Sequence, residues 1–258
     1  MCELLGMSAR RRRAVNVLLR EFYSHAEAHP HGWGLARFSD AGVPSMEKEP
    51  IKATESAYLK NRLSEPIEEK TFLAHIRFAT VGHLEYKNCH PFTTVDNRGR
   101  MWTLAHNGTV FSGAALNDYM GIQYGDTDSE RVLLHLVDRI DHAQNHRRHA
   151  LDADERFDVL LSAIAGLAKG NKLNLLVFDG EVLYAHCNFR DTLYVRREDD
   201  AVTFSTRPLS DGRWEPLPFT SLVAAKDGEI VRTSPPHGNE YFYNPEDYRL
   251  VYMDFARL

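Results

Sequence analysis

The last third of the chain alternates short apolar runs with turn-forming residues. This pattern restricts the folds that the chain can adopt. Asp179-Gly180 is a strong two-residue hairpin signal. Asp227-Gly228 predicts a second turn of this kind. The pattern therefore predicts a β meander of short antiparallel strands. We expect these strands at residues 173–178, 182–187, 192–196, 202–205, 219–225 and 229–232.

The preceding part of the chain mixes strands with amphipathic helices. Ser8 can cap a helix that runs to about Ala28, with the four arginines 10–13 as its solvated start. Thr127 and Glu130 have capping-box spacing ahead of a second apolar stripe. We also expect a turn feeding a strand at 29–38, a loop or edge hairpin at 39–53, a helix at 54–63, strands at 71–77 and 101–106, a charged linker at 141–153 and a helix at 154–169.

The order of these elements indicates the fold class. Strands come early, helices occupy the middle, and antiparallel strands follow. This order fits sheet packed on sheet with helical layers outside, an α+β arrangement rather than a doubly wound parallel sheet. Because we find no repeat, low-complexity segment or interdomain linker, we expect one domain over residues 1–258.

Charge and cysteine content exclude several classes of protein. The chain has 31 basic and 36 acidic residues, and its net charge of −5 argues against a nucleic-acid binder. No window approaches a membrane span, and the apolar run 14–19 is too short and polar for a signal peptide. Three cysteines without close pairing give no disulfide framework. We therefore expect a soluble, cytoplasmic protein with no nucleic-acid or membrane partner.

Cys2 has a chemistry that depends on its position. A small residue after Met1 permits removal of that Met, which would make Cys2 the mature N-terminus. Its thiol would then lie beside its own α-amine, whose usual pKa of roughly 7.7–8.0 suits a base near neutral pH. One residue would thus supply both nucleophile and base. The alternative is that Cys2 is merely a small buried residue.

Three further segments carry groups that can bind or polarise a substrate, and each has a simpler interpretation. Arg77, at a strand end before a turn, can hold a carboxylate bidentately or form a surface ion pair. Asn107-Gly108 is either a hairpin turn or an amide and a backbone N–H for a developing oxyanion. Asp128 is either part of a plain helix cap or a functional carboxylate.

Taken together, these segments resemble the class II glutamine amidotransferases of the N-terminal nucleophile superfamily. The first six residues, Gly32-Trp33-Gly34 and the strands around Asp179-Gly180 are similar to the small stand-alone members in particular. The likeness extends over most of the chain, more loosely after about residue 135, and implies a four-layer αββα fold. It rests on the ordered set of Cys2, the Arg77 strand, the loop Asn88 to Phe92, Asn107-Gly108 and the cap Thr127 to Glu130.

The resemblance implies a thiol amidohydrolase acting on glutamine or a γ-glutamyl amide. Cys2 would attack the γ-carbonyl, with its own α-amine as base. Arg77 would hold the α-carboxylate of the glutamyl group, and Asp128 its α-ammonium. The Asn107 side chain and the Gly108 backbone N–H would hold the tetrahedral oxyanion. Water would then hydrolyse the thioester to glutamate.

The resemblance also implies a supporting pocket. Thr80 and Gly82 would shape its floor through their backbone, and His90 would buttress it rather than act as the base. Two positions depart from relatives fused to synthases. Glu3 follows the cysteine where many synthetase-linked members have Gly, and Val81 stands where some sugar-phosphate-linked members have His. The exact pocket of those sugar-phosphate-linked members is therefore not carried over.

The sequence leaves three functional interpretations open. The protein is an amidohydrolase, a glutaminase subunit supplying ammonia to a separate synthase, or a glutamyl-binding pseudo-enzyme. Residues 131–258 carry no Walker-type loop, Rossmann fingerprint or phosphoribosyl-binding pattern. We expect no cofactor and no metal, because the histidines at 25–31 and 146–149 lack metal-binding spacing. The oligomeric state is left open.

Overall fold

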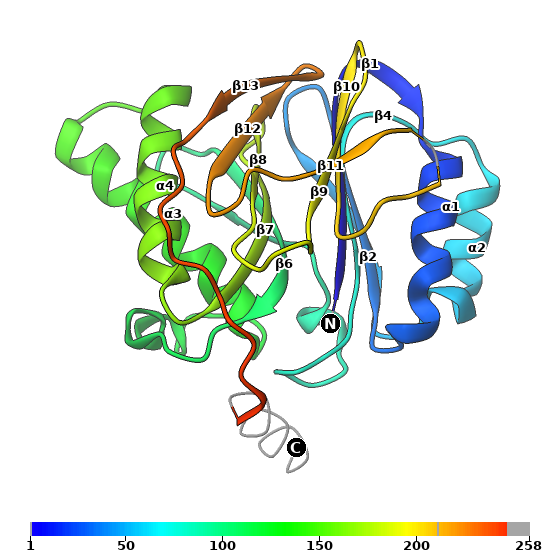
Figure 1. The fold of residues 1–258 in the computed structure, drawn as a ribbon, viewed down its shortest axis with the longest axis horizontal. Helices are drawn as coiled ribbons and strands as arrows, with labels where there is room; N and C mark the ends of the chain where they lie inside the picture. Colours follow the sequence, from blue (N-terminus) through cyan, green and yellow to red (C-terminus); the bar gives the residue numbers. More distant parts are fainter. Residues whose placement is uncertain (1, 211, 247–258) are drawn as a thin grey trace.

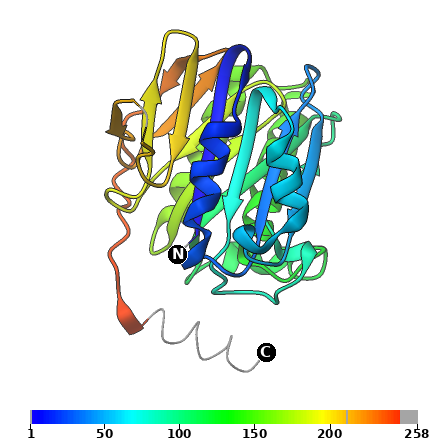
Figure 2. The ribbon, with the colours of Figure 1, turned by 90° about the vertical axis from the view of Figure 1, so that its right-hand side faces the viewer.

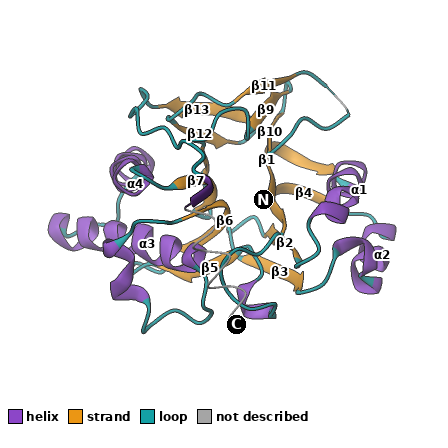
Figure 3. Cartoon of the chain, turned by 60° about the horizontal axis from the view of Figure 1, so that its bottom comes forward, coloured by secondary structure: helices purple, strands orange, loops and turns teal. Residues whose placement is uncertain are grey.

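Two antiparallel β-sheets lie face to face, and helices cover the outer face of each (Figure 1, Figure 3). The structure is a computed structural model that describes residues 2–210 and 212–246. The layers follow the order helix, sheet, sheet, helix, which confirms the predicted α+β class and the four-layer αββα arrangement.

The first sheet has seven strands, and the strand that begins next to Cys2 lies at its centre. The strand order is β11 (Trp214–Pro216), β9 (Tyr194–Arg197), β10 (Ala201–Ser205), β1 (Glu3–Ala14), β4 (Glu68–Ile76), β2 (Trp33–Phe38) and β3 (Pro44–Glu49). Helices α1 (Asn16–Ser24) and α2 (Ala57–Ser64) cover its outer face (Figure 2). The edge strand β3 pairs with β2, which confirms the predicted edge hairpin.

The second sheet has six strands and carries the other half of the candidate site. The strand order is β13 (Glu229–Thr233), β12 (Leu222–Lys226), β8 (Leu183–His186), β7 (Lys172–Phe178), β6 (Met101–Thr109) and β5 (Phe92–Val95). Helices α3 (Asp128–Arg147) and α4 (Ala153–Ala168) cover its outer face (Figure 1). No helix among the described residues is both long and apolar enough to cross a membrane.

The predicted helix from Ser8 to Ala28 is wrong in its first half. Strand β1 continues to Ala14, so the arginine run lies in a strand rather than at a solvated helix start. Acidic side chains between β9 and β10 form ion pairs with the last of these arginines. Arg13 contacts Glu198 at 3.1 Å and Asp200 at 3.2 Å. Pairing with β4 and β10 on both sides outweighs the helical signal of the local sequence.

The helices of the second layer begin and end at recognisable caps. Thr127 Oγ1 accepts a hydrogen bond from Glu130 N at 3.2 Å, which confirms the predicted cap of α3. The predicted linker at 141–153 is wrong, because α3 continues through Arg147 and ends where Arg148 adopts a left-handed φ of 63°. Asp152 then opens α4 with a complete capping box.

The strands of the last third form as predicted, but they do not make one meander. Strands β7, β8, β12 and β13 join the second sheet, whereas β9, β10 and the unpredicted β11 join the first. The two predicted turns are confirmed. Gly180 has φ 86°, and Asp227 and Gly228 have φ 49° and 84°, the left-handed backbone that such turns require.

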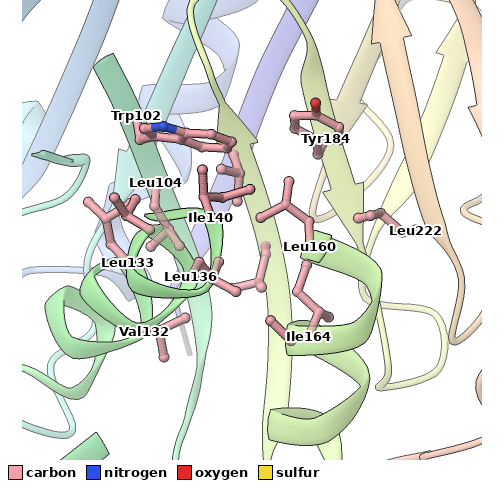
Figure 4. Packing of buried hydrophobic residues seen from close by; sticks show 14 of the residues in the cluster. Trp102, Leu104, Val132, Leu133, Leu136, Ile140, Leu160, Ile164, Tyr184 and Leu222 are labelled. Carbon is pink, nitrogen blue, oxygen red and sulfur yellow. The ribbon is translucent and has the colours of Figure 1, made fainter. Parts of the chain in front are cut away.

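Three apolar layers hold the sheets and helices together. Trp102, Leu136 and Leu160 belong to the cluster between the second sheet and α3 and α4 (Figure 4). Along β1, Leu4 lies in the cluster between the two sheets, whereas Leu5 packs against the α1 side. Since side chains alternate along a strand, an extended residue two positions before Leu4 faces the space between the sheets.

Candidate active site

Cys2 lies directly before β1, on the face of the first sheet that is turned toward the second. Glu3 pairs with Ile76, which places Cys2 beside the chain leaving β4. The half-buried thiol sulfur accepts a hydrogen bond from Phe78 N at 3.3 Å and lies 3.4 Å from Phe78 O. The pairing of β1 with β4 therefore brings the predicted nucleophile against the segment that follows Arg77.

The environment of the Cys2 thiol has opposing electrostatic effects. Burial raises its pKa, because the thiolate loses hydration. The Phe78 N–H and the positive charges of Arg77 and Lys172 act in the other direction. Since the thiolate is the nucleophilic form of cysteine, these groups favour the reactive state of a thiol that still needs a base.

Arg77 is almost fully buried, and its guanidinium closes the loop that follows β4. It donates to His83 O at 3.0 Å, Val81 O at 2.9 Å and Gly82 O at 3.1 Å. A surface ion pair is therefore the wrong interpretation. The three carbonyls fix the guanidinium, and its positive charge acts on the Cys2 thiol.

The loop after β4 docks on the segment before α3. His83 Nδ1 lies 2.6 Å from Asp126 Oδ2. Gly82 has φ 83°, and a Cβ there would lie 2.6 Å from Asp126 Oδ1. Thr80 Oγ1 lies 3.4 Å from Thr109 Oγ1, at the end of β6. Thr80 and Gly82 thus lie where the ends of β4 and β6 and the start of α3 meet.

Asn107 and Gly108 lie inside β6 rather than in a hairpin turn. They pair with Asn174 and Leu173 of β7, so the turn interpretation is wrong. A Cβ at Gly108 would overlap the carbonyl oxygen of Lys172 and the ring of His106. Glycine is therefore required by this close approach of β6 and β7 rather than by turn geometry.

Asp128 is the first residue of α3 and is buried at the end of β6. Its Oδ2 accepts a hydrogen bond from Val110 N at 2.9 Å, and the Ser129 hydroxyl lies 3.3 Å from Oδ1. The carboxylate is thus more than a helix cap. It is held beside the strand that carries Asn107 and Gly108.

His90 is buried and packs its ring on His75, with 4.1 Å between the ring centroids. Both ring nitrogens of His90 lack a hydrogen-bond partner among the described residues. Burial lowers the pKa of His90 and His75 well below the usual histidine value. A neutral stacked ring can buttress the neighbouring segments, as predicted for His90, and its role in the pocket stays a prediction.

Glu3 occupies the buried opposite face of the strand next to Cys2. Its carboxylate lies 2.9 Å from His25 Nδ1 and also contacts Arg207. These contacts explain how a charged residue fits at this buried position. The side chain ties β1 to the segment after α1 and turns away from the space between the sheets.

Lys172 is a buried residue of this region that the sequence did not reveal. Its Nζ donates to Asn107 Oδ1 at 3.3 Å. A lysine at the start of a strand normally suggests exposure, and no neighbouring motif marks this one as buried. Only the pairing of β6 with β7 shows that it adjoins the predicted oxyanion residues.

The residues gathered here are thiol, carboxylate, guanidinium, ammonium and amide groups. Within residues 2–210 and 212–246, no group of three or more His, Cys, Asp or Glu side chains could hold a metal ion. What the arrangement offers chemically is a thiol that accepts a backbone N–H and lies under the influence of the positive charges of Arg77 and Lys172.

The layered αββα fold, with a cysteine directly before a central strand, agrees with the class of protein that the sequence resembles. Residues 1–200 match the family of class-II glutamine amidotransferases. This chain belongs to that family.

Two relatives and one solved structure extend the match beyond residue 200. The candidate glutamine amidotransferase YafJ of Escherichia coli is 29% identical over 256 residues, covering 97% of each chain. An uncharacterized protein of Methanocaldococcus jannaschii is 29% identical over 260 residues, covering 90% of this chain and 71% of the relative. A "predicted glutamine amidotransferase" from Pseudomonas aeruginosa has the same fold, with TM-score 0.64 and 23% identity over 90% of this chain and 100% of that one.

Proposed function

We propose that this protein is a thiol amidohydrolase that cleaves glutamine or a γ-glutamyl amide. The observation that carries the proposal is the setting of the Cys2 sulfur. It accepts the Phe78 N–H at 3.3 Å, and the positive charges of Arg77 and Lys172 act on it. The family match supports glutamine as the substrate type.

The proposed reaction begins with removal of Met1, which frees the Cys2 α-amine. This amine takes the thiol proton, and the sulfur forms a bond to the γ-carbonyl carbon. The Asn107 amide and the Gly108 N–H stabilise the resulting oxyanion. When the carbon–nitrogen bond breaks, the α-ammonium returns the proton to the leaving ammonia or amine. Water then cleaves the thioester, releases glutamate and restores the thiol.

The two ends of the glutamyl group require opposite charges. We propose that Arg77 holds the α-carboxylate and Asp128 the α-ammonium. Both side chains are buried and held by hydrogen bonds to backbone groups, so they are fixed before the substrate arrives. Thr80, Gly82 and His90 complete the proposed pocket through the loops after β4 and before β5.

The test compares Cys2→Ala with Cys89→Ala, because Cys89 is a fully buried thiol whose pKa burial raises to about 11. Purified protein with a free N-terminus is offered glutamine and a set of γ-glutamyl amides, and released glutamate is measured. We expect Cys2→Ala to abolish turnover while keeping its melting temperature, and Cys89→Ala to remain active. Full activity of Cys2→Ala would exclude the mechanism.

The same experiment separates the other interpretations. A glutamyl-binding pseudo-enzyme would be stabilised by ligand without releasing glutamate. A glutaminase subunit would release ammonia efficiently only with a copurifying synthase. The proposal of an independent amidohydrolase requires turnover by the purified chain alone.

We also propose that residues 1–258 form one domain. Both sheets combine early and late segments, since β1 pairs with β10 and β6 pairs with β7. Neither half of the chain completes a sheet alone. The cytoplasmic location, the lack of a cofactor and the separate synthase partner stay predictions.

A further inference from the structure

Lys172 is a fully buried lysine at the start of β7, in the space between the two sheets. Its ammonium donates to Asn107 Oδ1 at 3.3 Å and lies 5.2 Å from the centre of the Phe189 ring. Burying a lysine is costly unless its charge is compensated. The polar contacts of this ammonium and the charges near it therefore decide whether it stays protonated.

The Asn107 contact determines the direction of the carboxamide. An amide side chain has an accepting oxygen at one end and a donating NH2 group at the other. Because Lys172 holds the oxygen, the NH2 group is directed the opposite way. The only orientation of Asn107 that can stabilise an oxyanion is one in which this NH2 group is available.

The backbone of Lys172 is fixed to the same strand. Its carbonyl oxygen lies 3.1 Å from His106 Nε2, and it approaches Gly108 too closely for any side chain there. The ammonium thus contacts Asn107, and the carbonyl oxygen lies against the two residues beside it, His106 and Gly108. Lys172 is anchored relative to the predicted oxyanion donors on two sides.

The charge of Lys172 also affects the pKa of the Cys2 thiol. Burial lowers the Lys172 pKa to about 8, and the Cys2 thiolate acts in the opposite direction. In turn, the Lys172 ammonium lowers the Cys2 thiol pKa against the effect of burial. The ammonium and the thiolate stabilise each other.

We propose that Lys172 is a positioning residue that orients the Asn107 amide and favours the thiolate of Cys2. This inference rests on the proposed function in taking Cys2 as the nucleophile. Lys172 acts through Cys2 and Asn107 and does not itself contact the substrate. Its loss is expected to lower kcat far more than it changes KM, because the groups it orients act on the reacting carbon.

The first test measures the reactivity of the thiol without any amide substrate. Alkylation of Cys2 by iodoacetamide is followed across pH by peptide mass in wild type, Lys172→Met and Lys172→Arg. We expect Lys172→Met to raise the apparent thiol pKa by about one unit or more, and Lys172→Arg to stay near wild type because it keeps the charge. With an active amide substrate, Lys172→Met should lose about tenfold or more in kcat with KM within about threefold.

Lys48→Met is the matched control. Lys48 is a partly buried lysine whose pKa is also lowered by burial, and its Nζ donates to Cys89 O and Pro91 O. Its replacement removes an ammonium of the same kind without touching Asn107. The thiol pKa of this variant should match wild type. A folded Lys172→Met protein with wild-type thiol pKa and kcat overturns the proposal.

A second measurement requires no lysine variant. In protein labelled with 13C at lysine Cε, the Lys172 signal should titrate near pH 8 in wild type. Cys2→Asp places a carboxylate where the thiolate would lie, so the Lys172 pKa should be higher in Cys2→Asp than in Cys2→Ala, which has no anion there. Equal Lys172 pKa values in these two variants overturn the coupling, even if Lys172→Met fails to fold.

These readouts are independent of the proposed activity. If the thiol and lysine titrations are coupled but no γ-glutamyl amide is cleaved, the proposed function fails and the positioning role at Cys2 stands. If amides are cleaved and the titrations are independent, the proposed function stands and the role of Lys172 is wrong.

Discussion

The carboxylate of Asp128 accepts a hydrogen bond from the backbone N–H of Val110, with 2.9 Å between Oδ2 and N. This bond ties the first turn of α3 to the end of β6, two residues after Gly108. Asp128 therefore combines an observed structural contact with its proposed role of holding the substrate α-ammonium. Substitutions of Asp128 can distinguish the structural contact from the proposed binding of substrate.

Asp128→Asn keeps an oxygen for the Val110 N–H but removes the negative charge. We expect KM for glutamine or the active γ-glutamyl amide to rise about tenfold or more, with kcat within about threefold. Asp128→Ala should raise KM similarly and also lower the melting temperature, because it loses the Val110 contact. Steady-state kinetics and thermal unfolding together check this; an unchanged KM in Asp128→Asn would show that the substrate is oriented differently.

Gly108→Ala tests the close approach of β6 and β7. The added Cβ would overlap Lys172 O and the His106 ring, so the backbone must shift. We expect a loss of about 3 kcal/mol or more in the free energy of unfolding. Gly166→Ala is the matched control, since it lies within α4 with no atom near the added Cβ, and it should stabilise the protein by up to about 1 kcal/mol. Urea unfolding of both variants measures the difference, and a neutral Gly108→Ala would contradict the packing described.

Buried neutral histidines should make the fold sensitive to acid. Burial and the neighbouring His237 lower the pKa of His186 to about 3, against an ordinary value of 6.5. Between these two values the unfolded chain binds a proton that the folded chain does not. The free energy of unfolding therefore falls as pH decreases through this window, by up to about 1.4 kcal/mol per pH unit for each such histidine.

Urea unfolding at pH 7.5, 6.0 and 5.0 measures this slope. His186→Gln removes one titrating group, so its stability should fall less steeply below pH 6.5 than that of wild type. Above pH 7 the two proteins should show parallel pH dependence. Identical slopes below pH 6.5 would mean that His186 is not buried in its neutral form.

An N-terminal extension should inactivate the protein because it blocks the proposed base. We expect a chain with a retained N-terminal tag to release no glutamate, whereas removal of the tag back to Cys2 restores activity. A C-terminally tagged protein serves as the control for expression and folding. Normal turnover by the N-terminally tagged chain would exclude the α-amine from its proposed role.

Much of the fold could be predicted because its turns and caps are local signals. Asp179-Gly180 and the cap at Thr127 depend on a few adjacent residues, and both form as expected. The segment from Ser8 to Ala14 could not be predicted in this way. It is a strand because β4 and β10 pair with it, and these partners are distant in sequence. The division of the last strands between two sheets is likewise decided by packing.

In the candidate site, too, local features could be predicted and features that depend on distant strand pairing could not. Cys2 and Arg77 are predictable from their positions in the chain, and the structure places the Cys2 sulfur against Phe78, the residue after Arg77. Asn107-Gly108 was found for its chemistry, but its place inside a strand was not. Lys172 gave no signal, because its burial and its contact with Asn107 arise only from the pairing of β6 with β7.

The most direct test of the account is the intact mass of untagged protein before and after a glutamine-like γ-electrophile. We predict loss of Met1 and a single adduct, mapped by peptide mass to Cys2, with Cys89 and Cys187 unmodified. Retained Met1, or folded protein that forms no adduct at Cys2, would contradict an N-terminal cysteine nucleophile.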